Sequence, residues 1–191
     1  EIVSSPQDAE VFLDGIRVGT TGSHSYSDKK IRSGEYRLQI KKDMYKTHTE
    51  TITIADNEKT SVNRELEKNF GILAPKGRPN NADIHINNNK YSGAGEIRLY
   101  PGSYRVSVTA EKYYGKNYSV KISAGDIQNL NYQLAPRTGI LSVNSTPHNA
   151  RIRLDGKETD KTTPAIIKNI MTGKHLLSLK LAESSVWTEK E

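Results

Sequence analysis

The chain has 191 residues, a formal net charge of +6 and a hydrophobic fraction of 34%. No apolar run approaches the roughly 20 residues that a bilayer-spanning helix needs. Cysteine is absent, which excludes disulfides, thiolate zinc sites and a cysteine nucleophile. Threonine, valine, isoleucine and tyrosine are plentiful, and this composition favours strands over helices.

The segment "AEVFLDGIRV" near the N-terminus predicts a β-hairpin. Ala9, Val11 and Leu13 point to one face, with the two-residue period of a strand. Asp14 and Gly15 then supply the positive backbone dihedrals of a two-residue type I′ turn. The following segment "GEYRLQIKK" alternates in the same way and predicts the next strand of the sheet.

The same pattern of residues recurs at intervals of about 70 residues. In each set a proline precedes an alanine, a turn dipeptide follows the alanine, and a glycine later precedes a residue with a ring side chain. The three sets are Pro6, Ala9, Asp14-Gly15 and Gly34/Tyr36; Pro79, Ala82, Asn87-Asn88 and Gly102/Tyr104; and Pro147, Ala150, Asp155-Gly156 and Gly173/His175. We therefore expect an all-β fold, with three small β-sandwich domains of about 70 residues in tandem.

The predicted domain boundaries enclose residues 1–67, 68–135 and 136–191. The connections between them are short and contain no long Gly/Ser or Pro tract, which predicts a semi-rigid rod. The third unit ends after "SSVWTEKE", where the other two have further strands. We expect this unit to be truncated or to close differently, and its unpaired edge to bind other strands if it is exposed.

The pattern "SxPxxAxVxLDGxxxGTT", followed by "SGEYRLQIKKDMYK", resembles the PEGA domain, a small β-module of bacteria and archaea. The Pro-Glu-Gly-Ala string that gives the domain its name corresponds to residues 6–9, 79–82 and 147–150. These segments keep the proline and alanine but lack the glutamate and glycine. The resemblance is strong in the first and third units and weak in the second. It implies an extracytoplasmic module of a cell-envelope, lipoprotein or surface protein, and it carries no catalytic residues.

The polar residues do not predict an enzyme, a cofactor or a metal site. The histidines fall at unrelated positions of the repeat and lack the close spacing of a zinc site, namely His24, His48, His85, His148 and His175. Asp14 and Asp155 correspond to Asn87, and a catalytic carboxylate would lose its function as an amide, whereas a turn residue need not. His175 takes the place of Tyr36 and Tyr104 and is expected to pack in the core.

Basic and aromatic residues offer two further candidate surfaces. Cations gather in the first unit at Lys29, Lys30, Arg32, Lys41, Lys42 and Lys46, but acidic residues are interspersed, so nucleic acid is not the expected partner. Tyr45, Tyr113, Tyr114 and Trp187 follow the third predicted strand of their units. Such rings either stack on sugars or anchor proteins, or close the end of each sandwich.

Two functions remain open at this point. The first is a non-catalytic structural or protein-interaction rod, whose partner is an envelope protein or an adjoining domain of the same chain. The second is a carbohydrate- or cell-wall-binding module that uses the exposed aromatic residues.

Overall fold

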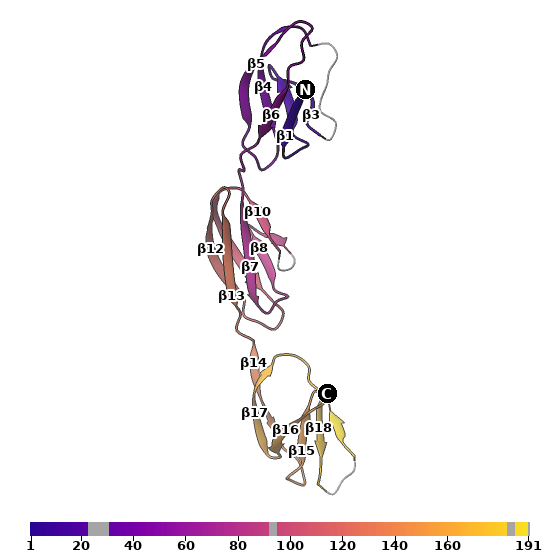
Figure 1. The fold of residues 1–191 in the computed structure, drawn as a ribbon. Helices are drawn as coiled ribbons and strands as arrows, with labels where there is room; N and C mark the ends of the chain where they lie inside the picture. The colour runs from indigo at the N-terminus through magenta and orange to yellow at the C-terminus, as the bar shows by residue number, and fades with distance from the viewer. Residues whose placement is uncertain (23–30, 92–94, 183–185, 191) are drawn as a thin grey trace. The chain divides into compact units, whose positions relative to one another are not determined.

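The structure, a computed structural model, describes residues 1–22, 31–91, 95–182 and 186–190. Its regular structure in these ranges is all β-strand, which confirms the predicted fold class (Figure 1). The strands form pairs of facing sheets in three successive parts of the chain. Contact density divides the chain differently, into two units whose boundary passes through strands of the middle part. The domain limits after residues 67 and 135 therefore stay predictions.

The N-terminal sandwich has six strands in the described residues. They are β1 (Ile2–Ser5), β2 (Glu10–Leu13), β3 (Ile16–Thr20), β4 (Gly34–Lys41), β5 (His48–Ile54) and β6 (Val62–Glu65). One sheet pairs β1 with β6 in parallel, and the other has the order β3-β2-β4-β5. Both sheets contribute to one buried cluster, formed by Ile2, Ala9, Val11, Leu13, Leu38, Ile40, Val62 and Leu66.

The middle sandwich has seven strands in the described residues. They are β7 (Gly71–Arg78), β8 (Asp83–Ile86), β9 (Asn89–Tyr91), β10 (Ile97–Leu99), β11 (Gly102–Thr109), β12 (Lys116–Ile122) and β13 (Ile127–Gln133). The four-stranded sheet has the order β12-β11-β8-β9, and the smaller sheet has the order β10-β7-β13. Strand β7 therefore has a neighbour on both edges.

The C-terminal sandwich again has six strands in the part of the chain that the structure describes. They are β14 (Thr138–Val143), β15 (Arg151–Leu154), β16 (Lys157–Thr162), β17 (Ala165–Met171), β18 (Leu177–Lys180) and β19 (Thr188–Lys190). The four-stranded sheet has the order β16-β15-β18-β19, and the smaller sheet pairs β14 with β17.

The three predicted hairpin turns are confirmed. Leu13 pairs with Ile16, Ile86 with Asn89 and Leu154 with Lys157, so each loop has two residues. Both loop residues have positive φ in every case, as a type I′ turn requires: Asp14 (49°), Gly15 (82°), Asn87 (47°), Asn88 (69°), Asp155 (50°) and Gly156 (76°).

The loop around the recurrent proline is held by buried and half-buried hydroxyl groups in the N-terminal and C-terminal sandwiches. Ser4 Oγ lies 2.6 Å from Thr21 Oγ1, which accepts a hydrogen bond from the Ala9 amide at 3.0 Å. Ser145, Thr163 and Ala150 repeat this arrangement. Because each buried hydroxyl finds partners, the loop closes without an unsatisfied polar group.

The middle sandwich replaces the serine by Gly77 and compensates from a distant strand. A Cβ at Gly77 would lie 2.0 Å from the Tyr132 carbonyl oxygen and 2.5 Å from its ring, so a serine cannot fit there. The Tyr132 hydroxyl instead donates to the Pro79 carbonyl at 3.1 Å, as Ser4 Oγ does to the Pro6 carbonyl at 2.7 Å.

The alternating strand after the glycine is buried to different extents. Leu38 and Ile40 are fully buried, and so are Val106 and Val108 of the middle sandwich. In the C-terminal sandwich, Leu177 and Leu179 are only half-buried. The alternation of apolar residues is the same in all three strands, so alternation alone does not predict this difference.

Candidate functional site

The three recurrent rings all bond to the backbone of their own strand connection. The Tyr36 hydroxyl donates to the Arg32 carbonyl and the Tyr104 hydroxyl to the Tyr100 carbonyl, each at 2.9 Å. His175 Nε2 lies 2.5 Å from the Met171 carbonyl. His175 thus corresponds to the two tyrosines, as predicted, but all three side chains are half-buried and none lies deep in the core.

His175 also contacts the aspartate of the hairpin turn. Its Nδ1 lies 2.7 Å from Asp155 Oδ2, while Asp155 Oδ1 accepts the Leu176 amide at 2.9 Å. The hydrogen bonds that His175 donates to the Asp155 carboxylate and to the Met171 carbonyl raise the pKa of His175 above its usual 6.5. The same His175 contact lowers the pKa of Asp155. Asp14 Oδ1 accepts a hydrogen bond from the Arg37 amide at 2.8 Å in the same way. Both carboxylates therefore bind a backbone amide.

Tyr45 and Tyr113 occupy equivalent and structural positions. Both form isolated bridges to the segment that follows the last strand of their sandwich, Tyr45 with Lys68 and Tyr113 with Pro136. Both side chains are half-buried, and Tyr45 packs against the N-terminal core cluster. This placement favours the interpretation that the ring closes the end of the sandwich.

Tyr114 is the most exposed of the four candidate aromatic residues. Its side chain is 59% exposed, and the Arg137 guanidinium lies 5.2 Å from the centre of its ring. A cation over the ring leaves the other face for a ligand. Tyr114 therefore remains a candidate contact residue.

Trp187 lies on the outer face of the C-terminal four-stranded sheet. Arg153 lies 4.1 Å from the centre of the indole and Lys180 lies 5.9 Å from it. Arg153 alternates with the buried Ile152 on β15, so the indole covers the side of the sheet that faces away from the core. Trp187 and Tyr45 both follow the third predicted strand of their units, but only Tyr45 packs against the core cluster of its sandwich.

Three of the described cations of the predicted basic cluster have local partners. Lys46 Nζ lies 2.6 Å from Glu67 Oε1, Lys42 Nζ donates to the Asp8 carbonyl at 3.1 Å, and Lys41 Nζ lies 4.5 Å from the centre of the Phe12 ring. Arg32 is exposed. Lys29, Lys30 and His24 lie outside the described residues.

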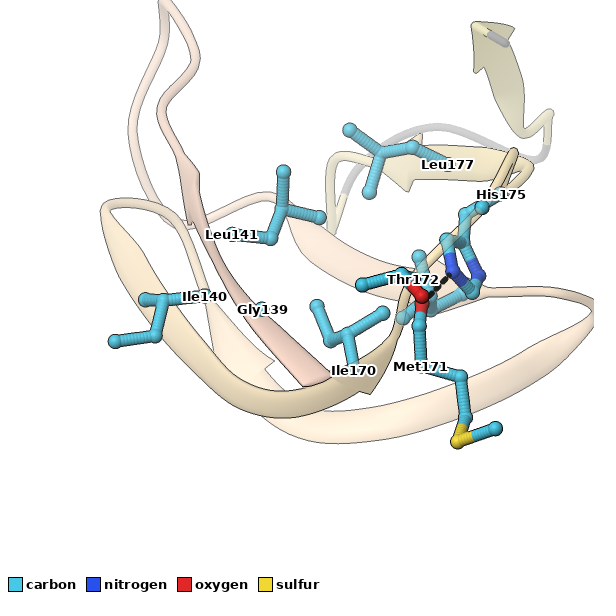
Figure 2. A pocket seen from close by; sticks show the side chains of 10 residues that line it. Gly139, Ile140, Leu141, Ile170, Met171, Thr172, His175 and Leu177 are labelled. Atoms are coloured by element: carbon cyan, nitrogen blue, oxygen red, sulfur yellow. Dashed lines mark hydrogen bonds between the residues drawn. The ribbon is translucent and has the colours of Figure 1, made fainter. Parts of the chain in front are cut away.

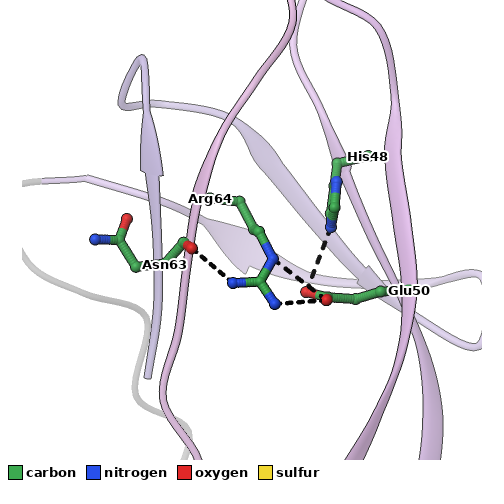
Figure 3. A network of polar contacts seen from close by, with 4 residues as sticks. All are labelled: His48, Glu50, Asn63 and Arg64. Carbon is green, nitrogen blue, oxygen red and sulfur yellow. Dashed lines mark hydrogen bonds and ion pairs between the residues drawn. The ribbon is translucent and has the colours of Figure 1, made fainter.

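Glu50 forms the main polar network of the N-terminal sandwich, which the sequence reasoning missed. It stands on β5 and binds Arg64 of β6, so it links the two sheets, with Arg64 Nη2 lying 2.7 Å from Glu50 Oε2 (Figure 3). His48 Nε2 lies 3.4 Å from Glu50 Oε1, at ion-pair distance. Burial opposes ionisation of Glu50, but the contacts with Arg64 and His48 outweigh it and lower the pKa. The Glu50–Arg64 ion pair therefore joins the two sheets of the sandwich.

A cavity of about 380 Å³ opens in the C-terminal sandwich. Its apolar lining includes Leu141, Ile170, Leu154 and Leu177, which come from both sheets. Figure 2 shows Leu141, Ile170 and Leu177 around it. His175 stands at its edge, where its ring bonds to Asp155 and Met171. The sequence reasoning did not find this cavity, because alternation shows where a side chain points but not what covers it.

Neither a metal centre nor a membrane span is found in the part of the chain that the structure describes. Histidine, aspartate and glutamate side chains do not gather there in groups of three or more that could hold an ion. No helix among these residues is long and apolar enough to cross a bilayer.

Comparison with known proteins identifies the family. The PEGA domain matches residues 1–69 and 138–183, so the chain belongs to the PEGA-domain family. A search of the curated proteins found no match. Among solved structures, the chain is similar to the Bacillus anthracis TIE protein, with 16% identity and a TM-score of 0.45. That alignment covers 100% of this chain and 47% of the TIE chain.

Proposed function

We propose that this chain is a non-catalytic structural or protein-interaction part of an envelope or surface protein, which acts as a spacer or docking module outside the cytoplasm. The roles of the recurrent polar residues carry the proposal. Asp14 and Asp155 hold backbone amides, and the Ser4–Thr21 and Ser145–Thr163 hydroxyl pairs hold the proline loops. The residues that the repeat preserves are thus used to fold each sandwich. Membership of the PEGA family supports the extracytoplasmic location.

Small-angle X-ray scattering tests the spacer role. A single compact domain of this length would have a radius of gyration of about 16 Å. Sandwiches joined in series by short connections predict a value well above this one. A value close to that of a compact domain would contradict the spacer role.

The exposed face of Tyr114 favours carbohydrate or cell-wall binding as a second candidate function. Aromatic faces stack on sugar rings, and Tyr113 lies beside it in the sequence. A peptidoglycan pull-down of the wild type, Tyr114→Ala and Ile127→Ala separates the two functions. Ile127 is a matched control, since it is 58% exposed in the same sandwich. Peptidoglycan binding that is lost only in Tyr114→Ala supports the carbohydrate-binding function. If the wild type does not bind peptidoglycan, the result supports the spacer function.

A further inference from the structure

Most of the positive charge of the chain lies in its middle part. Residues 68–135 contain nine lysines and arginines against four aspartates and glutamates, whereas residues 1–67 contain ten against twelve. The formal net charge of the whole chain is +6. Because an excess of one sign of charge attracts ligands of the opposite sign, the middle sandwich is the part of the chain that an anionic ligand would approach.

The smaller sheet of the middle sandwich has a cationic outer face without acidic residues. Its strands lie in the order β10-β7-β13, and the structure describes all three in full. None of the three contains an aspartate or a glutamate. Buried residues such as Leu73 and Leu130 alternate along the strands with outward-facing ones. The outward-facing residues include Ala74, Lys76, Arg98, Asn129 and Asn131.

Two backbone hydrogen bonds determine how β13 lies beside β7. The Ile72 amide donates to the Asp126 carbonyl at 2.9 Å, and the Leu134 amide donates to the Arg78 carbonyl at 2.9 Å. Both bonds advance in the same direction along the two strands, so β13 is parallel to β7. They also imply one and the same register at the two ends of the pair.

This register places two asparagine side chains next to Lys76. Asn131 lies beside Lys76, and Asn129 lies beside Ala74 on the same face. Neither asparagine side chain forms a hydrogen bond with another of the described residues. The short side chain of Ala74 does not cover the amides, so they are open to a ligand. Residues up to Lys76 on β7, all of β10 and residues up to Asn131 on β13 belong to one compact unit.

Lys76 and Arg98 are not neutralised by a carboxylate in the part of the chain that the structure describes. The Arg98 guanidinium lies 5.0 Å from the centre of the buried Phe70 ring, and this contact leaves its charge uncompensated. Lys76 is exposed. By contrast, six other cations form ion pairs with acidic side chains, namely Arg17, Lys46, Lys59, Arg64, Lys90 and Arg151.

The two cations are too far apart to share one small anion. Arg98 lies opposite Ile72, which precedes Lys76 by four residues on β7. With about 3.4 Å per residue along a strand and about 4.8 Å between strands, the two side chains start roughly 14 Å apart. The uncharged amides of Asn129 and Asn131 lie along this interval. The face therefore suits a long ligand with separated negative charges and polar uncharged groups between them.

We propose that this outer face of the middle sandwich binds a carboxylated polysaccharide in which uncharged sugars separate the charged ones. Lys76 and Arg98 pair with carboxylates of the polymer. The amides of Asn129 and Asn131 bind sugar hydroxyls, because an amide side chain donates and accepts hydrogen bonds as a hydroxyl does. The proposal goes beyond the spacer role, which does not depend on it, and its site is distinct from Tyr114.

Nucleic acid fits this face less well than a polysaccharide. A single strand carries one phosphate per 3.4 Å, so about four phosphates would lie along the interval between the two cations. Proteins that bind single strands also stack the bases on aromatic side chains. No outward-facing residue of β7, β10 or β13, which the structure describes completely, is aromatic.

The test titrates the isotope-labelled 191-residue chain with oligosaccharides of hyaluronan, in which every second sugar carries a carboxylate, and follows the amide signals by NMR. We expect saturable shifts that are largest in residues 72–76, 97–99 and 129–131, including the side-chain amides of Asn129 and Asn131. Hyaluronan whose carboxylates have been reduced to alcohols should bind at least about tenfold more weakly, because it cannot form the charged hydrogen bonds. Absence of binding, or equal affinity for the two probes, would overturn the proposal.

Two further anionic probes test the class of ligand. Poly-L-glutamate represents an acidic protein segment, and oligothymidylate represents nucleic acid. Both should bind more weakly than hyaluronan at the same concentration of negative charge. If either binds as tightly and shifts the same signals, the assignment to a polysaccharide is wrong.

A matched pair of double variants separates this face from the overall charge of the sandwich. Lys76→Ala with Arg98→Ala should weaken hyaluronan binding at least about tenfold, because two charged hydrogen bonds are lost. Arg105→Ala with Lys121→Ala removes the same charge from exposed positions on β11 and β12 of the four-stranded sheet, and should leave the affinity within about twofold of wild type. Equal losses in the two double variants would show binding to net charge alone and overturn the proposal.

The asparagine contact is tested without any change of charge. Asn131→Ala should weaken hyaluronan binding severalfold, whereas Asn117→Ala, at an exposed position on β12, should not. Unchanged affinity in Asn131→Ala would contradict recognition of sugar hydroxyls. The scattering test of the spacer role and the peptidoglycan test of Tyr114 use other readouts, so the three proposals can fail separately.

Discussion

The imidazole of His175 lies between two acceptors, the Asp155 carboxylate at 2.7 Å and the Met171 carbonyl at 2.5 Å. Both nitrogens can donate only when the ring is protonated. Tyr36 and Tyr104 fill the equivalent positions with a hydroxyl that needs no charge. The C-terminal sandwich therefore has a titratable group at a position where the other two have an uncharged one.

His175→Tyr should reduce the pH dependence of the C-terminal sandwich. The raised pKa of His175 in the folded state means that its stabilisation is fully present below about pH 6.5 and is lost as pH rises through the folded pKa. In the Tyr variant an uncharged hydroxyl replaces the imidazole, so this pH-dependent loss of stability should be absent. Thermal melts between pH 5.5 and 8.5, followed by the fluorescence of Trp187, the single tryptophan, should show a smaller decline in the variant. His148→Gln, at an exposed position, is the control. An unchanged decline in His175→Tyr would refute this assignment.

Asp14→Asn and Asp14→Ala should differ in stability. Asparagine occupies the equivalent position 87 with positive φ, so Asp14→Asn should be nearly neutral. Asp14→Ala removes the hydrogen bond to the Arg37 amide and places alanine at φ 49°, so it should cost about 1–2 kcal/mol. Urea titration followed by the NMR amide signals of β2 and β4 measures both. Equal stability of the two variants would count against a turn-holding role.

Gly71→Ala and Gly139→Ala form a matched pair at equivalent positions of β7 and β14. The added methyl group at position 71 meets the Ser123 carbonyl oxygen at 2.2 Å, and such overpacking should cost about 1–3 kcal/mol or more. At position 139 the same methyl group meets nothing within 4 Å, so stability should change little. Thermal denaturation followed by circular dichroism compares them. A large loss with Gly139→Ala would mean that the β14 edge is covered.

Removal of the Arg64 side chain should matter at neutral pH and lose its effect in acid. Arg64→Met leaves the half-buried Glu50 carboxylate without its hydrogen bonds to Arg64, which should cost about 1.5–3 kcal/mol. Because the pKa of Glu50 is lowered in the folded wild type, its contribution is present above about pH 4.5 and is lost as pH falls through the folded pKa. The difference in free energy of unfolding should therefore shrink below pH 4.5. A difference that persists at pH 2.5 would exclude an ionic clamp.

The sequence predicts the parts of this fold that depend on local chemistry. Asp14-Gly15, Asn87-Asn88 and Asp155-Gly156 form the expected turns, because positive φ is a property of those residues in their own loop. The inward positions of Ala9, Val11 and Leu13 follow from the period of a strand.

Long-range compensation and coverage were not predictable in this way. The Tyr132 hydroxyl makes the hydrogen bond to the Pro79 carbonyl that a serine at position 77 would make. Tyr132 lies 53 residues after Pro79 in the chain, so no local sequence pattern predicts this contact. Leu177 alternates as Leu38 does, yet only Leu38 is fully buried, because alternation gives the direction of a side chain and not what covers it. Tyr45 and Trp187 have similar positions in the sequences of their units. Tyr45 packs against the core of its sandwich, whereas Trp187 lies on the sheet face that points away from the core.

Residue-resolved hydrogen exchange of the 191-residue chain most directly tests the claim that β14 corresponds to β7 but pairs on one edge only among the described residues. An edge strand bonds only alternate amides to its single partner and leaves the others to solvent. Residues 138–143 should therefore alternate between slow and fast exchange, while the non-proline amides of residues 71–78 should exchange slowly throughout. Continuous protection across residues 138–143 would contradict the account.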